Sequence, residues 1–231
     1  EIVSRDWSSD VCSSDLAGRM AEGASGRNSG FMIDLPHEIQ AEDYAGEGES
    51  SDRDIIRLNR QAIAFAGRAV ERYNIDRNFF DPVGKVNGAA SDTADHLNRS
   101  YQAHLSKLGE ASELLDAKAM YEMTGSHHYI SGLYSPGTTM IQPAGYVRGV
   151  AEGLRRDGVL IFENSPVVKF EKTSATWCIS TAKHTVSACK VILANNGHLE
   201  SFGFAKQRLM HIFLYASMTV ELDKEIGRAH V

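Results

Sequence analysis

The stretch of chain from residue 142 to residue 197 limits most tightly what this sequence can fold into. Pro143 suits the first turn of a helix, residues 144–156 repeat apolar positions at helical spacing, and Asp157-Gly158 ends the pattern. Five short segments rich in apolar residues follow, reading VLIFEN, PVVKFEK, TWCIST, HTVSA and KVILANNG. Tight polar turns join the middle three, and the last is a continuous apolar run typical of a buried strand. The pattern predicts a β-α-β unit with a small inserted meander and a buried final strand, and therefore an α/β, or mixed α+β, fold.

The chain before this stretch is predicted to be mostly helical. A capping box formed by Ser51 and Asp54 opens an amphipathic helix over residues 52–73. Six apolar residues recur in this helix at spacings of three or four, which makes them its predicted apolar face: Ile55, Leu58, Ala62, Phe65, Ala69 and Tyr73. Other segments are predicted as strands at 79–86, 128–133 and 209–222 and as helices at 91–108 and 116–123.

Composition excludes several classes of protein. With 231 residues, 42% apolar and 23% charged, the chain has the material for one large or two small globular domains. The net charge is −6 and the basic residues are dispersed, so no nucleic-acid partner is expected. The longest apolar stretch, 209–220, is well short of the ~20 residues that a transmembrane helix needs. Three cysteines in no disulfide or CxxC pattern indicate a reducing compartment, and we expect a cytoplasmic protein.

The two ends of the chain are predicted to be non-native. Residues 10–16, DVCSSDL, can be back-translated as GAC GTG TGC TCT TCC GAT CTC, and the reverse complement of this DNA encodes EIGRAHV, the sequence of residues 225–231. One DNA element read in opposite senses at both ends resembles a sequencing-library adapter, so we interpret 1–16 and 225–231 as translated scars, outside the fold. The alternative is a pair of genuine polar tails.

Two segments are candidate ligand-binding sites. Residues 23–30, GASGRNSG, combine three glycines and two serines with an asparagine and an arginine, which together can present backbone N–H groups and charged donors to a phosphate. Their glycine spacing is neither GxGxxG nor a P-loop, and a plain surface loop is the alternative. Residues 191–198, VILANNGH, deliver small residues to the carboxyl end of a predicted strand, where ligands of open α/β sheets bind. An ordinary strand-to-loop turn is the alternative there.

No metal site is predicted. His127 and His128 are adjacent on a predicted strand, so their side chains point to opposite faces. Cys178, His184 and Cys189 have no spacing known from zinc sites.

Several segments, in this order, resemble one known family. GASGRNSGFM, GTTMIQPAGYVRGVAEGL, ENSPVVKFEK and VILANNGHLESFG are similar to the FAD-dependent oxidoreductases of the D-amino-acid oxidase and glycine oxidase type, over residues 17–224. The resemblance implies a Rossmann-like FAD domain, here partial, interleaved with a mixed-sheet substrate domain. It assigns 17–35 and 141–208 to the FAD domain and 36–140 and 209–224 to an incomplete substrate domain.

The resemblance also implies a cofactor, FAD, and residues that contact it. In the first segment these are Ser25, Arg27, Asn28, Ser29 and Gly30, which the resemblance places near the pyrophosphate and the ring system of the flavin. The others are Val168 beside the adenine and Ala194, Asn195 and Gly197 along the pyrophosphate. The implied reaction is hydride transfer to the flavin from a carbon beside the nitrogen of a small amine or amino acid. No catalytic side chain is assigned, and Tyr134 and Tyr146 are expected to pack in the core rather than face substrate. The alternatives are a flavin oxidation of an alcohol or polyol phosphate and a non-catalytic α/β binding module.

Two elements of the family pattern are absent from the printed sequence. The family has a GxGxxG turn, whose helix binds the pyrophosphate, and a strand ending in an acidic residue that holds the ribose; here Leu16 stands at the acid's position, next to Asp15. We therefore predict that this polypeptide is an internal fragment that binds FAD weakly or not at all and is inactive by itself.

Overall fold

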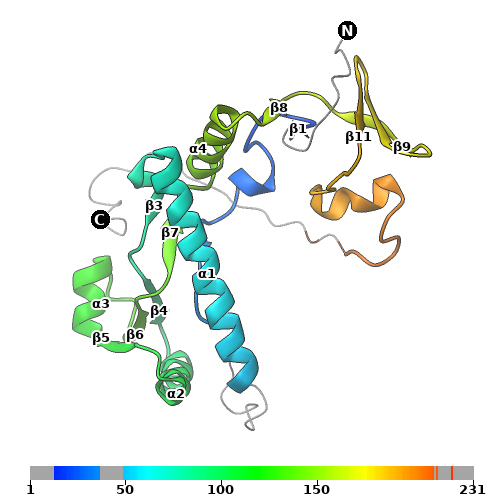
Figure 1. The fold of residues 1–231 in the computed structure, drawn as a ribbon. Helices are drawn as coiled ribbons and strands as arrows, with labels where there is room; N and C mark the ends of the chain where they lie inside the picture. Colours follow the sequence, from blue (N-terminus) through cyan, green and yellow to red (C-terminus); the bar gives the residue numbers. More distant parts are fainter. Residues whose placement is uncertain (1–12, 37–48, 211, 213–219, 221–231) are drawn as a thin grey trace. The chain divides into compact units, whose positions relative to one another are not determined.

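A computed structural model describes residues 13–36, 49–210, 212 and 220 (Figure 1). The chain divides into two compact units. Of the described residues, one unit contains 24–36, 49–153 and 220, and the other contains 13–23, 154–210 and 212. Helix α4 (Pro143–Arg156) crosses the division.

The larger unit contains two three-stranded antiparallel sheets. The first has the order β2-β7-β3, with strands Phe31–Met32, Thr139–Ile141 and Phe80–Asp81. The second has the order β4-β6-β5, with strands Lys85–Ala89, Ser131–Ser135 and Glu113–Asp116. Short 3-10 helices lie at Ala24–Gly26 and Arg77–Phe79.

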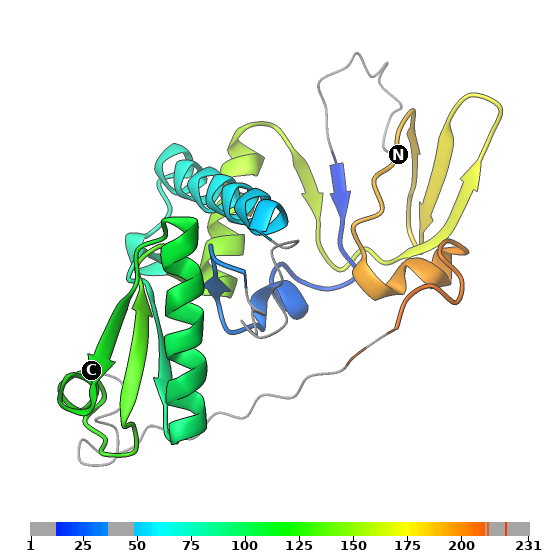
Figure 2. The same ribbon diagram turned by 90° about the horizontal axis from the view of Figure 1, so that it is seen from below.

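Two helices cover opposite faces of the β4-β6-β5 sheet, as Figure 2 shows. Helix α2 (Asp92–Leu108) contributes Leu105 and Leu108 to a cluster that includes Leu133 of β6. Helix α3 (Ala117–Thr124) places Met120 against Gly132, the preceding residue of β6. Because neighbouring residues of a strand point to opposite faces, α2 and α3 enclose this sheet as a three-layered body.

Helix α1 (Glu49–Tyr73) confirms the predicted helix but not its predicted apolar face. The buried residues are Ile56, Ala66 and Val70, whereas Leu58 is 55% exposed and Phe65 is 68% exposed. The helix carries a second apolar stripe, displaced by one residue from the predicted one, and that stripe packs inside the unit. Periodicity identifies apolar stripes but does not say which of two faces the core.

The smaller unit contains a parallel pair and a meander. Strand β1 (Ser13–Asp15) pairs with β8 (Leu160–Phe162), and β9 (Val167–Lys172), β10 (Trp177–Thr181) and β11 (Thr185–Ala188) form the antiparallel sheet β11-β10-β9. A 3-10 helix, η3, spans Asn196–Phe202. The Phe170 and Trp177 rings stack at 4.6 Å between centroids, and Phe202 lies edge-on to Phe170 at 6.3 Å. This aromatic cluster fastens η3 to the meander.

Helices α2, α3 and α4 and strands β8 to β11 confirm the predicted elements to within about two residues. The predicted strand at 79–86 is wrong in extent, because it is divided into β3 and β4 around Pro82 and Gly84. Proline lacks the N–H that a ladder needs, and Gly84 has φ of +80°. The predicted strand at 128–133 starts only at Ser131, after a turn.

The buried strand predicted in KVILANNG, residues 190–197, is wrong. These residues form no strand, and Ile192 is 90% exposed. A parallel strand is stable only beside a hydrogen-bonded neighbour, and the parallel sheet of this unit has the two strands β1 and β8 alone among the described residues.

Two further expectations concern the ends. Ser13–Asp15, predicted to lie outside the fold, pair with β8, and the Leu16 backbone N–H donates to the Phe162 carbonyl at 2.9 Å. In the predicted strand at 209–222, Leu209, Met210 and Ile212 are not in a strand, and most of the other residues lie outside the described part of the chain.

Candidate functional site

The glycine-serine loop, residues 23–30, is organised by one asparagine. The Asn28 side-chain amide donates to the carbonyls of Ala24 at 3.2 Å and Ser25 at 3.0 Å, and its oxygen accepts from the Gly30 N–H at 3.0 Å. Asn28 therefore closes the loop upon itself, as asparagine commonly does in turns.

Gly30 fixes the end of this loop to strand β7. Its carbonyl accepts from the Ile141 N–H at 2.8 Å, and its φ is +78°. A Cβ at this position would lie 2.1 Å from the Ile141 carbonyl oxygen. The close approach of the two backbones requires a glycine.

With the loop held in this way, other polar side chains on it face solvent. Ser25, Arg27 and Ser29 are all exposed. A guanidinium and two hydroxyls on one short, internally braced loop form a suitable set of donors for an anionic group. The structure thus brings together the five residues that the sequence proposes here: Ser25, Arg27, Asn28, Ser29 and Gly30.

The other proposed residues lie in the smaller unit. Val168 is on β9 and 65% exposed, and Ala194, Asn195 and Gly197 lie at the start of η3. Both polar atoms of the Asn195 side chain are buried without a hydrogen-bond partner in the described part of the chain. Because an unsatisfied buried amide costs about 1–3 kcal/mol, a group that supplies a donor and an acceptor is expected to complete this turn.

A network of ion pairs built on one buried carboxylate follows strand β2, and the sequence-based proposals did not include it. Asp34 is 1% exposed, and its Oδ2 accepts from Nε and Nη2 of Arg60 at 3.1 and 3.0 Å. Arg60 also pairs with Glu110, which follows α2. The network ties β2, α1 and the end of α2 together, and only the fold brings these distant residues into contact.

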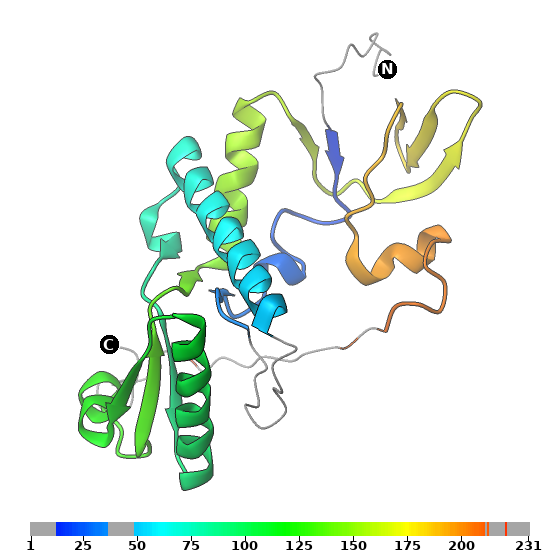
Figure 3. The same ribbon diagram turned by 60° about the horizontal axis from the view of Figure 1, so that its bottom comes forward.

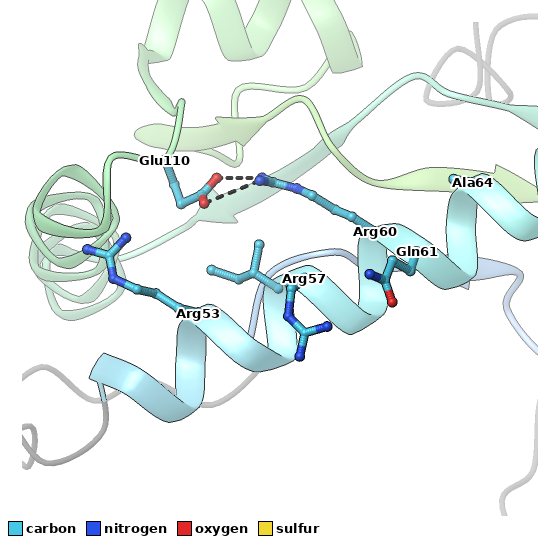
Figure 4. Close-up of a pocket in the computed structure, with 7 residues that line it drawn as sticks. Arg53, Arg57, Arg60, Gln61, Ala64 and Glu110 are labelled. Carbon is cyan, nitrogen blue, oxygen red and sulfur yellow. Dashed lines mark hydrogen bonds and ion pairs between the residues drawn. The ribbon is translucent and has the colours of Figure 1, made fainter.

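Arg60 also lines an open pocket of about 520 Å³ along α1, shown in Figure 4. Arg53 and Arg57 line the pocket as well, and each has a hydrogen-bond partner. Arg53 donates to the Leu108 carbonyl at 3.0 Å, and Arg57 donates to Asp54 at 3.1 Å. No residue proposed from the sequence lines this pocket.

Two tyrosines considered from the sequence make internal contacts. The Tyr146 hydroxyl donates to the Ala66 carbonyl at 3.2 Å, and burial raises its pKa. The Tyr134 hydroxyl donates to the Val83 carbonyl at 3.3 Å. Both interactions are structural and connect elements of the larger unit.

The histidine and cysteine groups do not converge. His127 and His128 occupy the turn before β6, and Cys178 and Cys189 are free thiols. Within the described ranges, no three His, Cys, Asp or Glu side chains form a group able to hold a metal ion. Nor does any helix in these ranges have the length and apolar character needed to cross a membrane.

Comparisons with known proteins agree on one class. Residues 6–229 match the sequence profile of the family described as DAO, FAD dependent oxidoreductase. The chain is 26% identical over 182 residues to a probable oxidoreductase OrdL of Haemophilus influenzae and 27% identical over 190 residues to gamma-glutamylputrescine oxidoreductase of Escherichia coli. Each alignment covers 79% of this chain and 42% of the relative, so the chain spans about two fifths of these curated relatives.

Solved structures show the same fold. Glycine oxidase from Geobacillus kaustophilus superposes with a TM-score of 0.67 at 20% identity, covering 84% of this chain and 50% of that one. L-amino acid deaminase from Proteus myxofaciens superposes with a TM-score of 0.62 at 14% identity, covering 83% of this chain and 41% of that one.

The mixed α/β architecture and these likenesses define the class as flavin-dependent oxidoreductases. The chain belongs to the DAO family of FAD-dependent oxidoreductases, as its sequence resemblance indicated.

The residues present fit the family's cofactor, FAD. The exposed donors of Ser25, Arg27 and Ser29 suit its phosphates, and the buried amide of Asn195 has both a donor and an acceptor to offer.

Proposed function

We propose that this chain is part of an enzyme that oxidises a C–N bond of a small amine or amino acid with FAD. The observation that carries the proposal is the family match over residues 6–229. Proteins similar to this chain carry the names gamma-glutamylputrescine oxidoreductase, glycine oxidase and L-amino acid deaminase. These names support a substrate that contains nitrogen.

In this proposal the chain's own residues bind and orient. Ser25, Arg27 and Ser29 donate to the cofactor from the glycine-serine loop, while Asn28 and Gly30 keep that loop in shape. Val168 lies beside the adenine, and Ala194, Asn195 and Gly197 border the pyrophosphate. When bound, FAD would supply the acceptor for a hydride from the carbon beside the substrate nitrogen; the nitrogen would lose a proton, and water would hydrolyse the resulting imine.

We further propose that residues 17–35 and 141–208 belong to a FAD domain, that 36–140 and 209–224 belong to a substrate domain, and that 1–16 and 225–231 are scars. The complementary reading of DVCSSDL and EIGRAHV supports the last point. Sequencing of the parent gene tests it, because natural codons continuing through either end would overturn it. Two free thiols, Cys178 and Cys189, support a reducing, cytoplasmic location.

One alternative has a specific observation in its favour. A glycerophosphate oxidase from Mycoplasma pneumoniae shares the fold with a TM-score of 0.52 at 13% identity. An alcohol or polyol phosphate is therefore the second substrate class to examine, and a non-catalytic binding module is the third possibility.

A substrate screen under anaerobic conditions separates these functions. The longer protein, loaded with FAD, is mixed with amines, with D- and N-methyl amino acids and with glycerol phosphate, and loss of visible flavin absorbance is followed. Reduction by amines or amino acids supports the proposal, reduction by glycerol phosphate alone favours the alternative, and no reduction by any compound favours the module.

A further inference from the structure

The β2-β7-β3 sheet has one covered face. Thr139 on this face is 2% exposed. The Phe80 ring lies 6.4 Å from the Tyr146 ring of α4, and a Cβ at Gly67 of α1 would lie 3.5 Å from it. Helices α1 and α4 therefore supply the packing on this side, as can be followed in Figure 3.

The opposite face carries a row of three side chains. Phe31 of β2 pairs with Met140 of β7, and Asp81 of β3 pairs with the same Met140. Because directly paired residues project from the same face of a sheet, all three side chains share this face. Phe31 is 49% exposed, Met140 is half-buried and Asp81 is exposed. We call this the Phe31–Asp81 row.

The row continues directly from the glycine-serine loop. Phe31 follows Gly30, whose backbone is fixed against β7 by the 2.8 Å hydrogen bond to Ile141. A ligand lying along the row would meet the proposed cofactor loop at the Phe31 end. At the other end it would meet a carboxylate, about 10 Å away, since neighbouring strands are about 4.8 Å apart.

We propose that the Phe31–Asp81 row is a substrate-binding surface that selects amines carrying a second, cationic group. This inference rests on the proposed function. Phe31 and Met140 contact the alkyl part of the substrate, and the Asp81 carboxylate attracts the distant ammonium group. Such a substrate is a diamine, or an amino acid with a basic side chain, whose reacting nitrogen lies at the Phe31 end.

The test compares Asp81→Asn with the unmodified longer protein holding FAD. Two amines of equal chain length are used, one a straight-chain diamine and the other the monoamine with a methyl group in place of the second nitrogen. Binding is measured separately by calorimetry with butyltrimethylammonium, which has no nitrogen lone pair for oxidation, and with its uncharged carbon isostere. Glu122→Gln, which removes an exposed carboxylate of α3, is the matched control.

We expect Asp81→Asn to raise KM for the diamine about tenfold, to leave kcat within twofold and to leave the monoamine unaffected. The preference for butyltrimethylammonium over its isostere should fall by a similar factor. Asp81→Glu should restore most of both preferences, and Glu122→Gln should change neither.

Two results would overturn the inference: equal effects of Asp81→Asn on both amines, or no effect on either amine or on the binding of butyltrimethylammonium. In both cases, reduction of the flavin by amines would still support the proposed function. If no amine reduced the flavin, the proposed function itself would fail, and the calorimetric comparison would still show whether Asp81 binds a cation.

Discussion

Single residues fix the shape of the proposed cofactor loop. Gly30 combines a φ of +78° with a backbone contact that excludes any side chain, and Asn28 closes the loop with three hydrogen bonds. The sequence singled out both residues but not their roles, because the partner of Gly30, Ile141, is more than a hundred positions away. Asp34 was not predicted for the same reason, since its partner Arg60, which also pairs with Glu110, meets it only in the folded chain.

Gly30→Ala is expected to destabilise the larger unit by at least 2 kcal/mol, because the new methyl group combines an unfavourable φ with overlap on the Ile141 carbonyl. Urea unfolding measures the change in the free energy of unfolding. Gly23→Ala is the control, because a Cβ there meets nothing within 4 Å. Equal stabilities for the two variants would contradict the described approach of β2 to β7.

Tyr101 gives the larger unit a stability that depends on pH. Its hydroxyl donates to the Pro36 carbonyl at 2.9 Å, and burial, reinforced by Asp34, Asp52 and Glu110, raises its pKa from 10.0 to about 12. The folded protein therefore keeps a proton that the unfolded chain loses first. Its contribution to stability is complete below about pH 10 and is lost progressively as the pH rises toward 12.

Replacing Tyr101 by Phe should flatten this part of the alkaline profile. The free energy of unfolding is measured at several pH values between 9 and about 12 for both proteins, and Tyr121→Phe, which changes an exposed tyrosine, serves as control. If the free energy of unfolding of Tyr101→Phe and of the unmodified chain depended on pH in the same way, the burial of the Tyr101 hydroxyl would be contradicted.

At the scale of elements, the helices followed from the sequence more closely than the strands. Capping and periodicity are local signals, so α1 to α4 were predicted to within a few residues. The apolar run at 190–195 was not a strand because pairing depends on a neighbour, which local sequence does not reveal. The prediction of the buried face of α1 was wrong for a related reason. Ile56 and Leu58 both belong to apolar stripes, and only tertiary packing decides which stripe is buried.

Helix α2 provides a direct test of a local signal. Ser91 caps its first turn by accepting from the Ala94 N–H at 3.3 Å, and Gly109 ends it with φ of +79°. Ser91→Ala should lower the free energy of unfolding by about 1 kcal/mol, as measured by chemical denaturation. Ser106→Ala, an exposed change inside the same helix, should cost no more than about 0.5 kcal/mol, and equal losses would argue against the cap.

On the scale of the whole molecule, the residues proposed to contact FAD come from separate segments of the chain. The printed sequence has no GxGxxG turn, which in the family contributes a helix N-terminus to the pyrophosphate. The purified chain is therefore expected to carry little FAD. Absorbance spectroscopy after purification with added FAD measures this directly, and a stoichiometric flavin absorbance in the purified chain would contradict the expectation.

The central claim is that the glycine-serine loop and the Asn195 turn both hold FAD in the longer protein. Its most direct test is the dissociation constant of FAD for that protein and for its Arg27→Ala and Asn195→Ala variants, with Arg99→Ala as a control on α2. Each of the first two should weaken binding about tenfold or more, as loss of a charge-assisted or buried hydrogen bond does, and the control should not. Unchanged FAD affinity in both Arg27→Ala and Asn195→Ala would contradict the account.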